Sequence, residues 1–428
     1  MSHKPYKGFE PKWVDTPAPA DSYRSIFRWG DPEFFKYPKE SLYKMMKEVF
    51  KLADDDFREY TDDIGFDKVD LSDHPVKLAQ EHIDALREIV GDEGISISDY
   101  DRLSVAYGFT AYDILRLRHK VIDSVPDVVL YPDTTEQVEK IVEAKNRDNE
   151  GRNMFKTRAV KFFMDGVLES ITAFLLEPYE KADGRPEGWR GDQIWDPDNM
   201  NKCVAAIDKA GMGIHVHCAG DAAVKQSLDA IEYAQKVNGR EDRRHCITHI
   251  FLVDPNDIHR FKDMGVVAML NSYWAQIDET YFVNGTYTGM DRIAHTYPIN
   301  SFFKAGCVVA NASDYPITAV PNPFVGMEIG VTRIAPDNYH PWVLNYDDPR
   351  IHGDFWPEER ACIEDMIDSF TIAQAYANFV DDVSGSIEVG KEADMIVVDQ
   401  NILTCKSEDI GLAQVERTLF RGETLYKK

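Results

Sequence analysis

The sequence predicts an α/β protein whose main part is a partial or distorted (β/α)8 TIM-like barrel. Three observations lead to this fold class. From residue 156 onward, short β-branched runs alternate with helical segments of about 10–15 residues, the pattern of a parallel sheet. Residues 1–150 lack this alternation and are mostly helical in pattern, whereas residues 381–428 form short alternating runs separated by glycines. We therefore divide the chain into an N-terminal segment (1–150), a barrel part (151–380) and a small β-sheet region (381–428).

The N-terminal segment contains only isolated elements. Apolar residues at near-helical spacing predict a helix over residues 42–52, and the segment 70–91 predicts another that ends at Gly91. The run VVLYP then predicts a short strand, and a further helix should start near Thr134 or Thr135. One strand followed by one helix is too little to identify a fold for this segment.

The barrel part reads as five strands separated by helices. The expected strands are AVKFFMD, GIHVHC, HCITHIF, VVAMLNS and CVVANASD, and helices are expected over residues 197–211, 221–237, 254–265 and 298–306. Repeated right-handed crossovers of this kind give either a barrel or a doubly wound sheet, and we favour the barrel. After a helical stretch at 362–380, the segments 385–401 and 415–428 predict the small C-terminal sheet.

Composition restricts the partners. The formal net charge of -26 argues against nucleic acid, because phosphate binding needs clustered Lys and Arg. No apolar run approaches the ~20 residues that cross a bilayer, and the N-terminus has no apolar signal-peptide core, so we expect a cytoplasmic protein without a membrane partner. Its six cysteines are scattered and are expected to be reduced. A small molecule is the expected partner, and a homo-oligomer is an open alternative to a monomer.

Polar side chains at the ends of the expected strands indicate the chemistry. Barrel active sites gather at the carboxyl ends of the strands, and there the sequence places Lys161, His215, His217, His249 and Asp314. Histidines with a carboxylate are a common ligand set for zinc or a similar divalent ion, whose bound water is a nucleophile at neutral pH. Each residue taken alone has a structural alternative: a solvent lysine, a core histidine or a helix-capping aspartate. The joint order favours a metal site.

The same residues lie in motifs that resemble amidohydrolase family 3. These motifs are VKFFMDGVLESITAFLLEPY, IHVHCAGDAAV, RRHCITHI, ASDYPI with NPF and VTR, and GSIEVGKEADMIVVD. The resemblance implies that His217, His249 and Asp314 are metal ligands, that Asp314 is also the general base, and that Lys161 is a lysine that can be carboxylated to bridge two metals. It makes His215 a neighbour of the site, Asp165 a lining residue and Arg333 a candidate substrate contact.

The part of the family pattern that should precede Lys161 is not found in this sequence. Such enzymes carry an HxH pair on their first barrel strand, but His3, His74, His82 and His119 are the histidines upstream of Lys161, and all are isolated. The segments RWGDPEFFKYP, 99–120 and 126–144 instead resemble the start of FAD-linked oxidases of the vanillyl-alcohol oxidase type, nearest the alkyl-dihydroxyacetonephosphate synthase branch. No GGG or GxGxxG follows Val142, so FAD binding is not expected.

The leading hypothesis is a hydrolase of carbon–nitrogen bonds other than peptide bonds, such as those of amides or N-formyl compounds. It would use one or two divalent ions, with zinc the first candidate, and would be impaired by the loss of the strand-one HxH. The alternatives are an FAD-linked oxidoreductase and an inactive fusion of two truncated enzymes joined between residues 144 and 155.

Overall fold

The chain forms two compact units, residues 1–156 and residues 157–428. The computed structural model describes residues 18–26, 65–107, 111–134, 158–182, 184–315, 317–318, 321–336 and 348–428, with isolated positions between 44 and 56 and between 136 and 144. Within the helix expected over residues 42–52, the described residues 44, 46–48 and 50 are helical, and residues 42, 43, 45 and 49 lie outside the described residues. The segment RWGDPEFFKYP and, apart from residue 144, the expected join also lie outside them.

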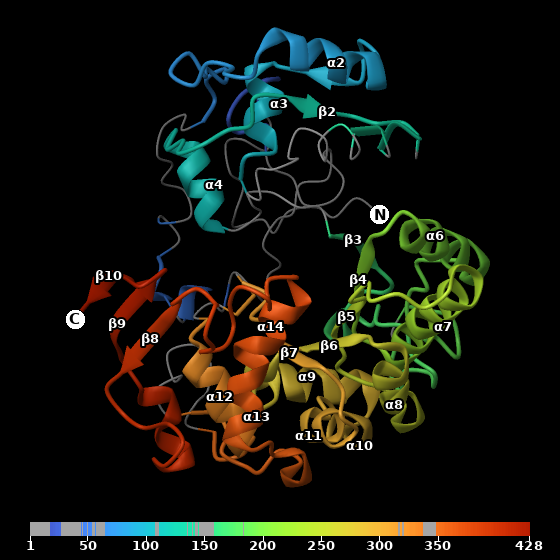
Figure 1. The fold of residues 1–428 in the computed structure, drawn as a ribbon, viewed down its shortest axis with the longest axis vertical. Coiled ribbons are helices and arrows are strands. Elements are labelled where there is room, and N and C mark those ends of the chain that lie inside the picture. The colour runs from blue at the N-terminus through green and yellow to red at the C-terminus, as the bar shows by residue number, and fades with distance from the viewer. Residues whose placement is uncertain are drawn as a thin grey trace. The chain divides into compact units, whose positions relative to one another are not determined.

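The first unit is built from short helices and one two-stranded sheet (Figure 1). Strand β1 (Ile95–Ser96) pairs antiparallel with β2 (Val129–Leu130), which lies in the VVLYP run. Its described helices include α2 (Gln80–Val90), α3 (Asp99–Ser104) and α4 (Ala111–Arg118). Helix α2 ends as predicted at Gly91, whose φ of 81° suits a residue without a Cβ. A small core contains Tyr23, Ile26, Val69, Leu71, Leu103 and Leu117.

The second unit centres on a five-stranded parallel sheet, which confirms the α/β class. Its strands occur in the order β3 (Ala159–Phe163), β4 (Gly213–Cys218), β5 (Cys246–His249), β6 (Val267–Leu270) and β7 (Val309–Asn311). All five lie in runs that the sequence predicted to be strands. Within the described residues β3 and β7 are the two ends of this sheet and do not pair with each other, so these strands form an open sheet and not a closed barrel.

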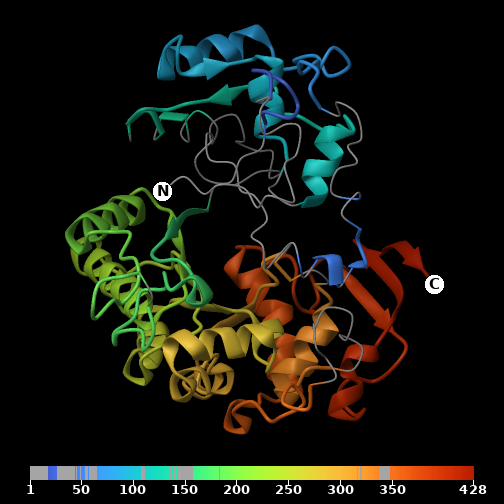
Figure 2. The ribbon, with the colours of Figure 1, turned by 180° about the vertical axis from the view of Figure 1, so that it is seen from behind.

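Helices α6 (Pro197–Lys209), α7 (Asp221–Asn238) and α8 (Pro255–Met264) cover one side of the sheet (Figures 1 and 2). Two of them begin at aspartate N-caps followed by proline, a favourable start for a helix. The strands direct Ile214, Val216 and Cys218 toward this side, and all three are fully buried in the main core.

The opposite face of the sheet is less completely covered. Helices α13 (Ile363–Phe370) and α14 (Ile372–Ala377) contact β7, and Ala373, Tyr376 and Ala377 pack on a small apolar cluster formed by β5, β6 and β7. Toward β3 the face is open: Lys161 is exposed and Phe163 is 54 % exposed.

The remaining elements surround the carboxyl ends of the strands or follow them. They are η3 (Leu168–Ser170), η4 (Ser272–Trp274), α9 (Glu279–Thr288), α10 (Met290–Ile293), α11 (Ile299–Lys304), α12 (Pro323–Thr332), η6 (Pro357–Glu359) and η7 (Ser407–Leu412).

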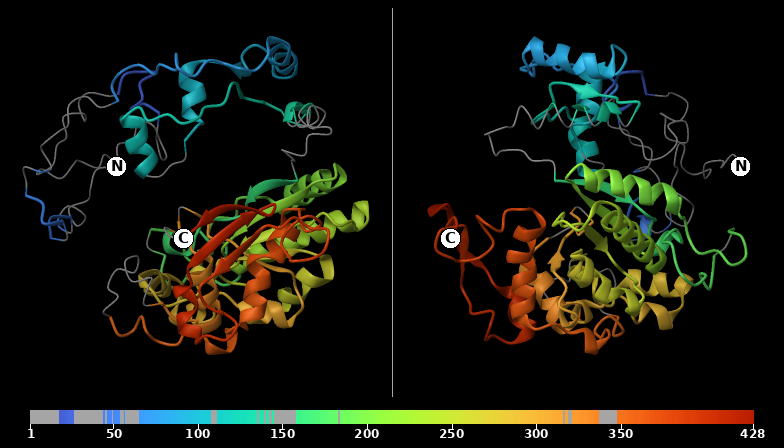
Figure 3. Two further views of the ribbon diagram at one scale, coloured as in Figure 1. Left: turned by 60° about the vertical axis from the view of Figure 1, so that its left-hand side comes forward. Right: turned by 45° about the vertical axis from the view of Figure 1, so that its right-hand side comes forward.

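An antiparallel sheet of β8 (Met395–Val398), β9 (Val415–Phe420) and β10 (Glu423–Lys427) ends the chain, drawn in red in Figure 3. It lies within the predicted C-terminal β-region. Among the residues that the structure describes, none of the helices has the length and apolar character needed to span a bilayer.

Candidate active site

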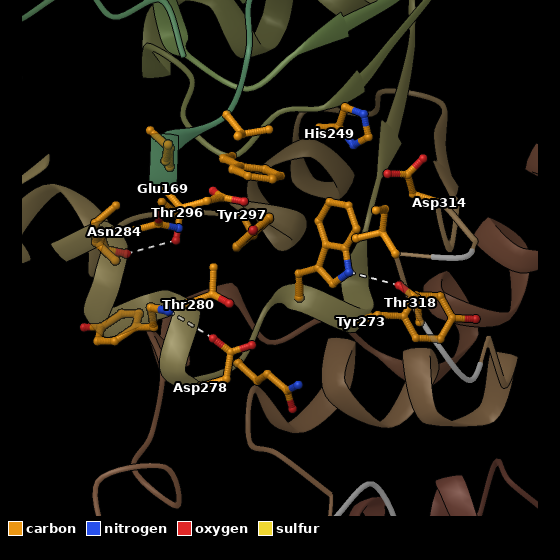
Figure 4. A pocket seen from close by; sticks show the side chains of 18 of the residues that line it. Glu169, His249, Tyr273, Asp278, Thr280, Asn284, Thr296, Tyr297, Asp314 and Thr318 are labelled. Carbon is orange, nitrogen blue, oxygen red and sulfur yellow. Dashed lines mark hydrogen bonds between the residues drawn. The ribbon is translucent and has the colours of Figure 1, made fainter. Parts of the chain in front are cut away.

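A cavity of about 510 Å³ lies at the carboxyl ends of the parallel strands. His217 and His249 reach it from β4 and β5, and Asp314 reaches it from the segment after β7. Residues of η3, η4 and α9 complete its walls. The volume falls within the ~300–1,000 Å³ typical of small-molecule sites. Three of the residues predicted to carry the chemistry therefore share one pocket (Figure 4).

The two imidazoles meet because the backbone departs from strand geometry at His249. The register of β4 and β5 pairs Cys218 with His249 and His217 with Thr248. Regular alternation would therefore direct His249 toward the helices, like Cys218, and away from His217. His249 instead has a φ of 77°, and Ile250 follows with a φ of 49°. The ring centroids of His217 and His249 lie 4.4 Å apart.

Asn271 fixes which nitrogen of His249 carries the proton. Its Nδ2 donates to the carbonyl of Ala312 at 2.7 Å, so its Oδ1 faces His249 and accepts a hydrogen bond from Nδ1 at 2.9 Å. The remaining nitrogen, Nε2, therefore carries the lone pair. Trp274 stacks on the same ring, with centroids 5.7 Å apart and planes 12° apart, and its Nε1 donates to Thr318. The orientation of His249 is thus set from two directions.

His217 has the opposite tautomer. Its Nε2 lies 2.9 Å from the carbonyl of Gly166, an oxygen that can only accept, so Nε2 is protonated and Nδ1 carries the lone pair. Burial lowers the pKa of both His217 and His249 to about 4. Both rings are therefore neutral at neutral pH, the state that metal binding requires.

Asp314 lines the same pocket as the imidazoles, and its side chain is exposed. It adopts a φ of 53°. Desolvation raises its pKa, and the neighbouring His217 and Lys161 act in the opposite direction. In the part of the chain that the structure describes, however, no three His, Cys, Asp or Glu side chains gather closely enough to hold a metal ion. The structure thus brings two of the expected donors together and places the third in the same cavity.

Lys161 and His215 lie outside the lining of this cavity. They are register partners on β3 and β4 and therefore share the open face of the sheet. The Lys161 Nζ lies 5.3 Å from the ring centroid of Phe163. Desolvation lowers the pKa of Lys161, and it lowers that of His215 to about 4, with Lys161 acting in the same direction.

Asp165 organises the pocket from behind. Its buried carboxyl group accepts hydrogen bonds from the backbone amides of Phe174, Ala219 and Gly220 at 2.8–2.9 Å. Burial raises the pKa of Asp165 to about 7, which these three amides oppose. The carboxylate thereby joins the segment after β3 to the turn after β4, the strand that carries His217.

Arg333 also acts through the backbone. It is fully buried, and its guanidinium donates to the carbonyls of Phe355, Tyr297 and Thr296 at 3.0–3.1 Å. Those three residues line the cavity, so Arg333 lies behind its wall. This differs from the substrate contact expected from the sequence, since a side chain without exposed surface meets no ligand directly.

Many of the residues that shape the site were not predicted from the sequence. Asn271 and Trp274 directly follow β6, so the same rule that selected the other strand ends would have indicated them. Glu169, Asp278 and Glu279 come from η3 and the start of α9, and no spacing in the sequence connects them.

Comparisons with known proteins identify the family of the chain. The model of the Amidohydrolase family matches residues 67–426. The chain is 29% identical over 267 residues to Protein LONG AFTER FAR-RED 3 of Arabidopsis thaliana, covering 62% of this chain and 42% of the relative. It is 24% identical over 242 residues to N-substituted formamide deformylase of Arthrobacter pascens, covering 56% and 41%. The chain thus spans less than half the length of these relatives.

Among solved structures, an uncharacterized metal-dependent hydrolase from Pyrococcus horikoshii is similar with a TM-score of 0.48 at 20% identity, over 61% of this chain and 50% of that one. The resemblance of the N-terminal segment to FAD-linked oxidases covers fewer residues than the sequence motifs suggested. Alkyldihydroxyacetonephosphate synthase of Trypanosoma brucei brucei is 31% identical over 75 residues, covering 18% of this chain and 12% of that protein. The family model begins at residue 67 and so includes much of the oxidase-like region.

Proposed function

The chain belongs to the Amidohydrolase family, and from this premise we propose that it is a metal-dependent hydrolase of carbon–nitrogen bonds other than peptide bonds, such as those of amides and N-formyl compounds. The observation that carries the proposal is the meeting of the His217 and His249 rings, 4.4 Å apart, in the cavity that Asp314 also lines. The name of one relative, N-substituted formamide deformylase, favours an N-formyl substrate.

The donor chemistry of the cavity fits a divalent ion. Nδ1 of His217 and Nε2 of His249 are lone-pair nitrogens on neutral rings, and Asp314 adds a carboxylate. Zinc prefers such a mixture of imidazole and carboxylate ligands. A bound zinc ion would polarise the scissile carbonyl and lower the pKa of water. In this proposal Lys161 is a further ligand when carboxylated, which allows one or two ions.

The protein's own groups then perform the remaining steps. Asp314 accepts the proton of the attacking water, and desolvation strengthens it as a base by raising its pKa. Asn271 keeps the lone pair of His249 directed into the cavity. Trp274 covers one face of that ring and excludes water from it. Because the chain lacks an HxH pair upstream of Lys161, we expect activity below that of a family member that has one.

Zinc content and turnover of the full chain test the proposal together. After loading with zinc and removal of excess, inductively coupled plasma mass spectrometry should find close to one ion per chain, and amine release from N-benzylformamide should depend on it. Replacing His217 or His249 with glutamine should reduce both. The matched control is His82→Gln, because the His82 side chain is 47 % exposed. A zinc content of the unmodified chain far below one ion per chain would contradict the proposed centre. So would a zinc content of the His217→Gln and His249→Gln variants equal to that of the unmodified chain.

A further inference from the structure

The cavity has a second polar end, away from the two imidazoles. Figure 4 shows His249 and Asp314 on one side and Glu169, Asp278 and Asn284 on the other. This second end is formed where η3 packs against α9. It is not part of the proposed metal centre, and none of its polar residues is needed for the hydrolytic steps described above.

The second end is strongly acidic. Glu169, Asp278 and Glu279 all line it, and the described residues that line the cavity include no Lys or Arg. Burial raises the pKa of Asp278 to about 6, and the negative charges of Glu279 and Glu169 act in the same direction. Arg333 lies behind the wall, but backbone carbonyls occupy its guanidinium. The carboxylates therefore face a cavity without a cation of its own.

Several acceptors at this end are buried without a hydrogen-bond partner. They are Oε1 of Gln276, Oδ1 of Asn284 and Oε1 of Glu279. Gln276 is 3 % exposed and Asn284 is 5 % exposed, and all three residues line the cavity. An unpaired buried polar atom costs about 1–3 kcal/mol, so a ligand that donates hydrogen bonds here would recover that free energy.

Capping explains only part of this arrangement. Asp278 is the N-cap of α9, and its Oδ1 accepts the Tyr281 amide at 2.9 Å. That contact explains why an aspartate occupies position 278, but it does not explain the unpaired buried oxygens of Glu279, Gln276 and Asn284. A ligand with several N–H donors and a positive charge would satisfy both the unpaired acceptors and the excess negative charge.

Aromatic rings add a second attraction for a cation. The rings of Tyr281 and Phe355 lie 5.4 Å apart, and Tyr297 lines the same end. Aromatic faces stabilise a cation by about 0.5–2 kcal/mol, more when it is desolvated.

We propose that this end of the cavity binds an ammonium group of the substrate, so that the preferred substrate is an N-acyl or N-formyl compound with a second, cationic amine. This inference rests on the proposed function, because it places the scissile amide at His217 and His249 and the ammonium group at Glu169, Asp278 and Glu279. A primary ammonium has three N–H donors, the same number as the unpaired acceptors of Gln276, Glu279 and Asn284.

Equilibrium binding tests the inference without relying on turnover. Isothermal titration calorimetry on the full chain would compare N-formyl-1,5-diaminopentane with N-pentylformamide, which has the same amide and no cation, at a pH above the value of about 6 for Asp278. We expect the cationic probe to bind at least about tenfold more tightly, equivalent to ~1.4 kcal/mol. Equal affinities, stronger binding of the neutral probe, or no binding of either would overturn the inference.

Matched variants identify the residues responsible. Asp278→Asn keeps a good helix cap while removing the charge, and Glu169→Gln is nearly isosteric. Each should reduce the preference for the cationic probe severalfold, whereas Glu423→Gln, an exposed position on β10, should leave it unchanged. An unchanged preference in both cavity variants would overturn the assignment. A retained preference without hydrolysis would refute the proposed function alone, and hydrolysis of both probes without a preference would refute this inference alone.

Discussion

Replacing Asn271 with alanine should weaken zinc binding although Asn271 is not itself a proposed ligand. Asn271 is fully buried and makes two hydrogen bonds, one from Nδ2 to the Ala312 carbonyl and one from the Nδ1 of His249 to its own Oδ1. The first bond fixes the orientation of the amide, and the second fixes the tautomer of the imidazole. Without the amide, His249 is free to carry its proton on Nε2, where the lone pair is needed.

The two lost hydrogen bonds determine the expected loss in the free energy of unfolding. Each removal leaves a buried group unpaired, at about 1–3 kcal/mol, and truncation to alanine also opens a small cavity. We therefore expect the free energy of unfolding to fall by about 3 kcal/mol. Outer partners of ligating histidines typically change metal affinity by about 10–100-fold, so the zinc dissociation constant should rise by that factor.

Urea denaturation and zinc competition with a fluorescent chelator measure the two effects separately. The control is Asn238→Ala, because the Asn238 Nδ2 also makes two hydrogen bonds, to the Ala205 carbonyl and to Asp208, both at 2.8 Å. None of these three residues lines the cavity. Asn238→Ala should lower stability without changing zinc affinity. An equal change of zinc affinity in both variants, or none in Asn271→Ala, would refute the tautomer argument.

Three further predictions follow from buried groups. Arg333→Met should lower the free energy of unfolding in urea by about 3 kcal/mol or more, because three backbone carbonyls lose their donor. In metal-free protein, imidazole NMR titration should give midpoints near 4 for His217 and His249. Since these values are lowered from 6.5, both rings contribute stability above pH 6.5 that is lost as the pH falls toward 4. Gly220→Ala should destabilise by about 1–3 kcal/mol or more in urea, because its Cβ would lie 2.0 Å from the Phe174 carbonyl oxygen.

Different results would count against each of these arguments. Arg360, whose side chain is 40 % exposed, is the control for Arg333, and Arg360→Met should cost less than about 1 kcal/mol. A similar loss in both arginine variants would show that burial of Arg333 does not matter. Histidine midpoints at or above 6.5 would contradict the desolvation of the rings. A Gly220→Ala protein as stable as the wild type would show that the turn after β4 can relax.

The positions of the strands were predictable because short apolar, β-branched runs between helical segments can be recognised from neighbouring residues alone. All five parallel strands lie in the predicted runs, and the carboxyl-end rule selected His217, His249 and Asp314, which share the cavity. How far the predicted partial or distorted barrel would close was not predictable in the same way, since closure depends on pairing between distant strands. The five described strands form an open sheet.

The arrangement within the site depends on contacts that a sequence does not display. The positive φ of His249 brings its ring to His217, and a non-glycine residue adopts that region only when its surroundings hold it there. Likewise, Glu169 and Asp278 line one cavity although 109 positions separate them in the numbering. Arg333 was predicted to contact substrate because the sequence does not reveal that its side chain is buried behind Tyr297 and Phe355, where it donates to their carbonyls.

The place of Lys161 on the terminal strand β3 has a consequence beyond metal binding. The outer edge of such a strand carries backbone amides and carbonyls that can pair with a strand of another molecule. A charged side chain at mid-strand discourages that pairing, and Lys161 lies at the centre of β3 beside the exposed ring of Phe163. Among the described strands, Lys161 therefore stands where a positive charge disfavours the addition of a strand from another molecule, a role that needs no metal ion.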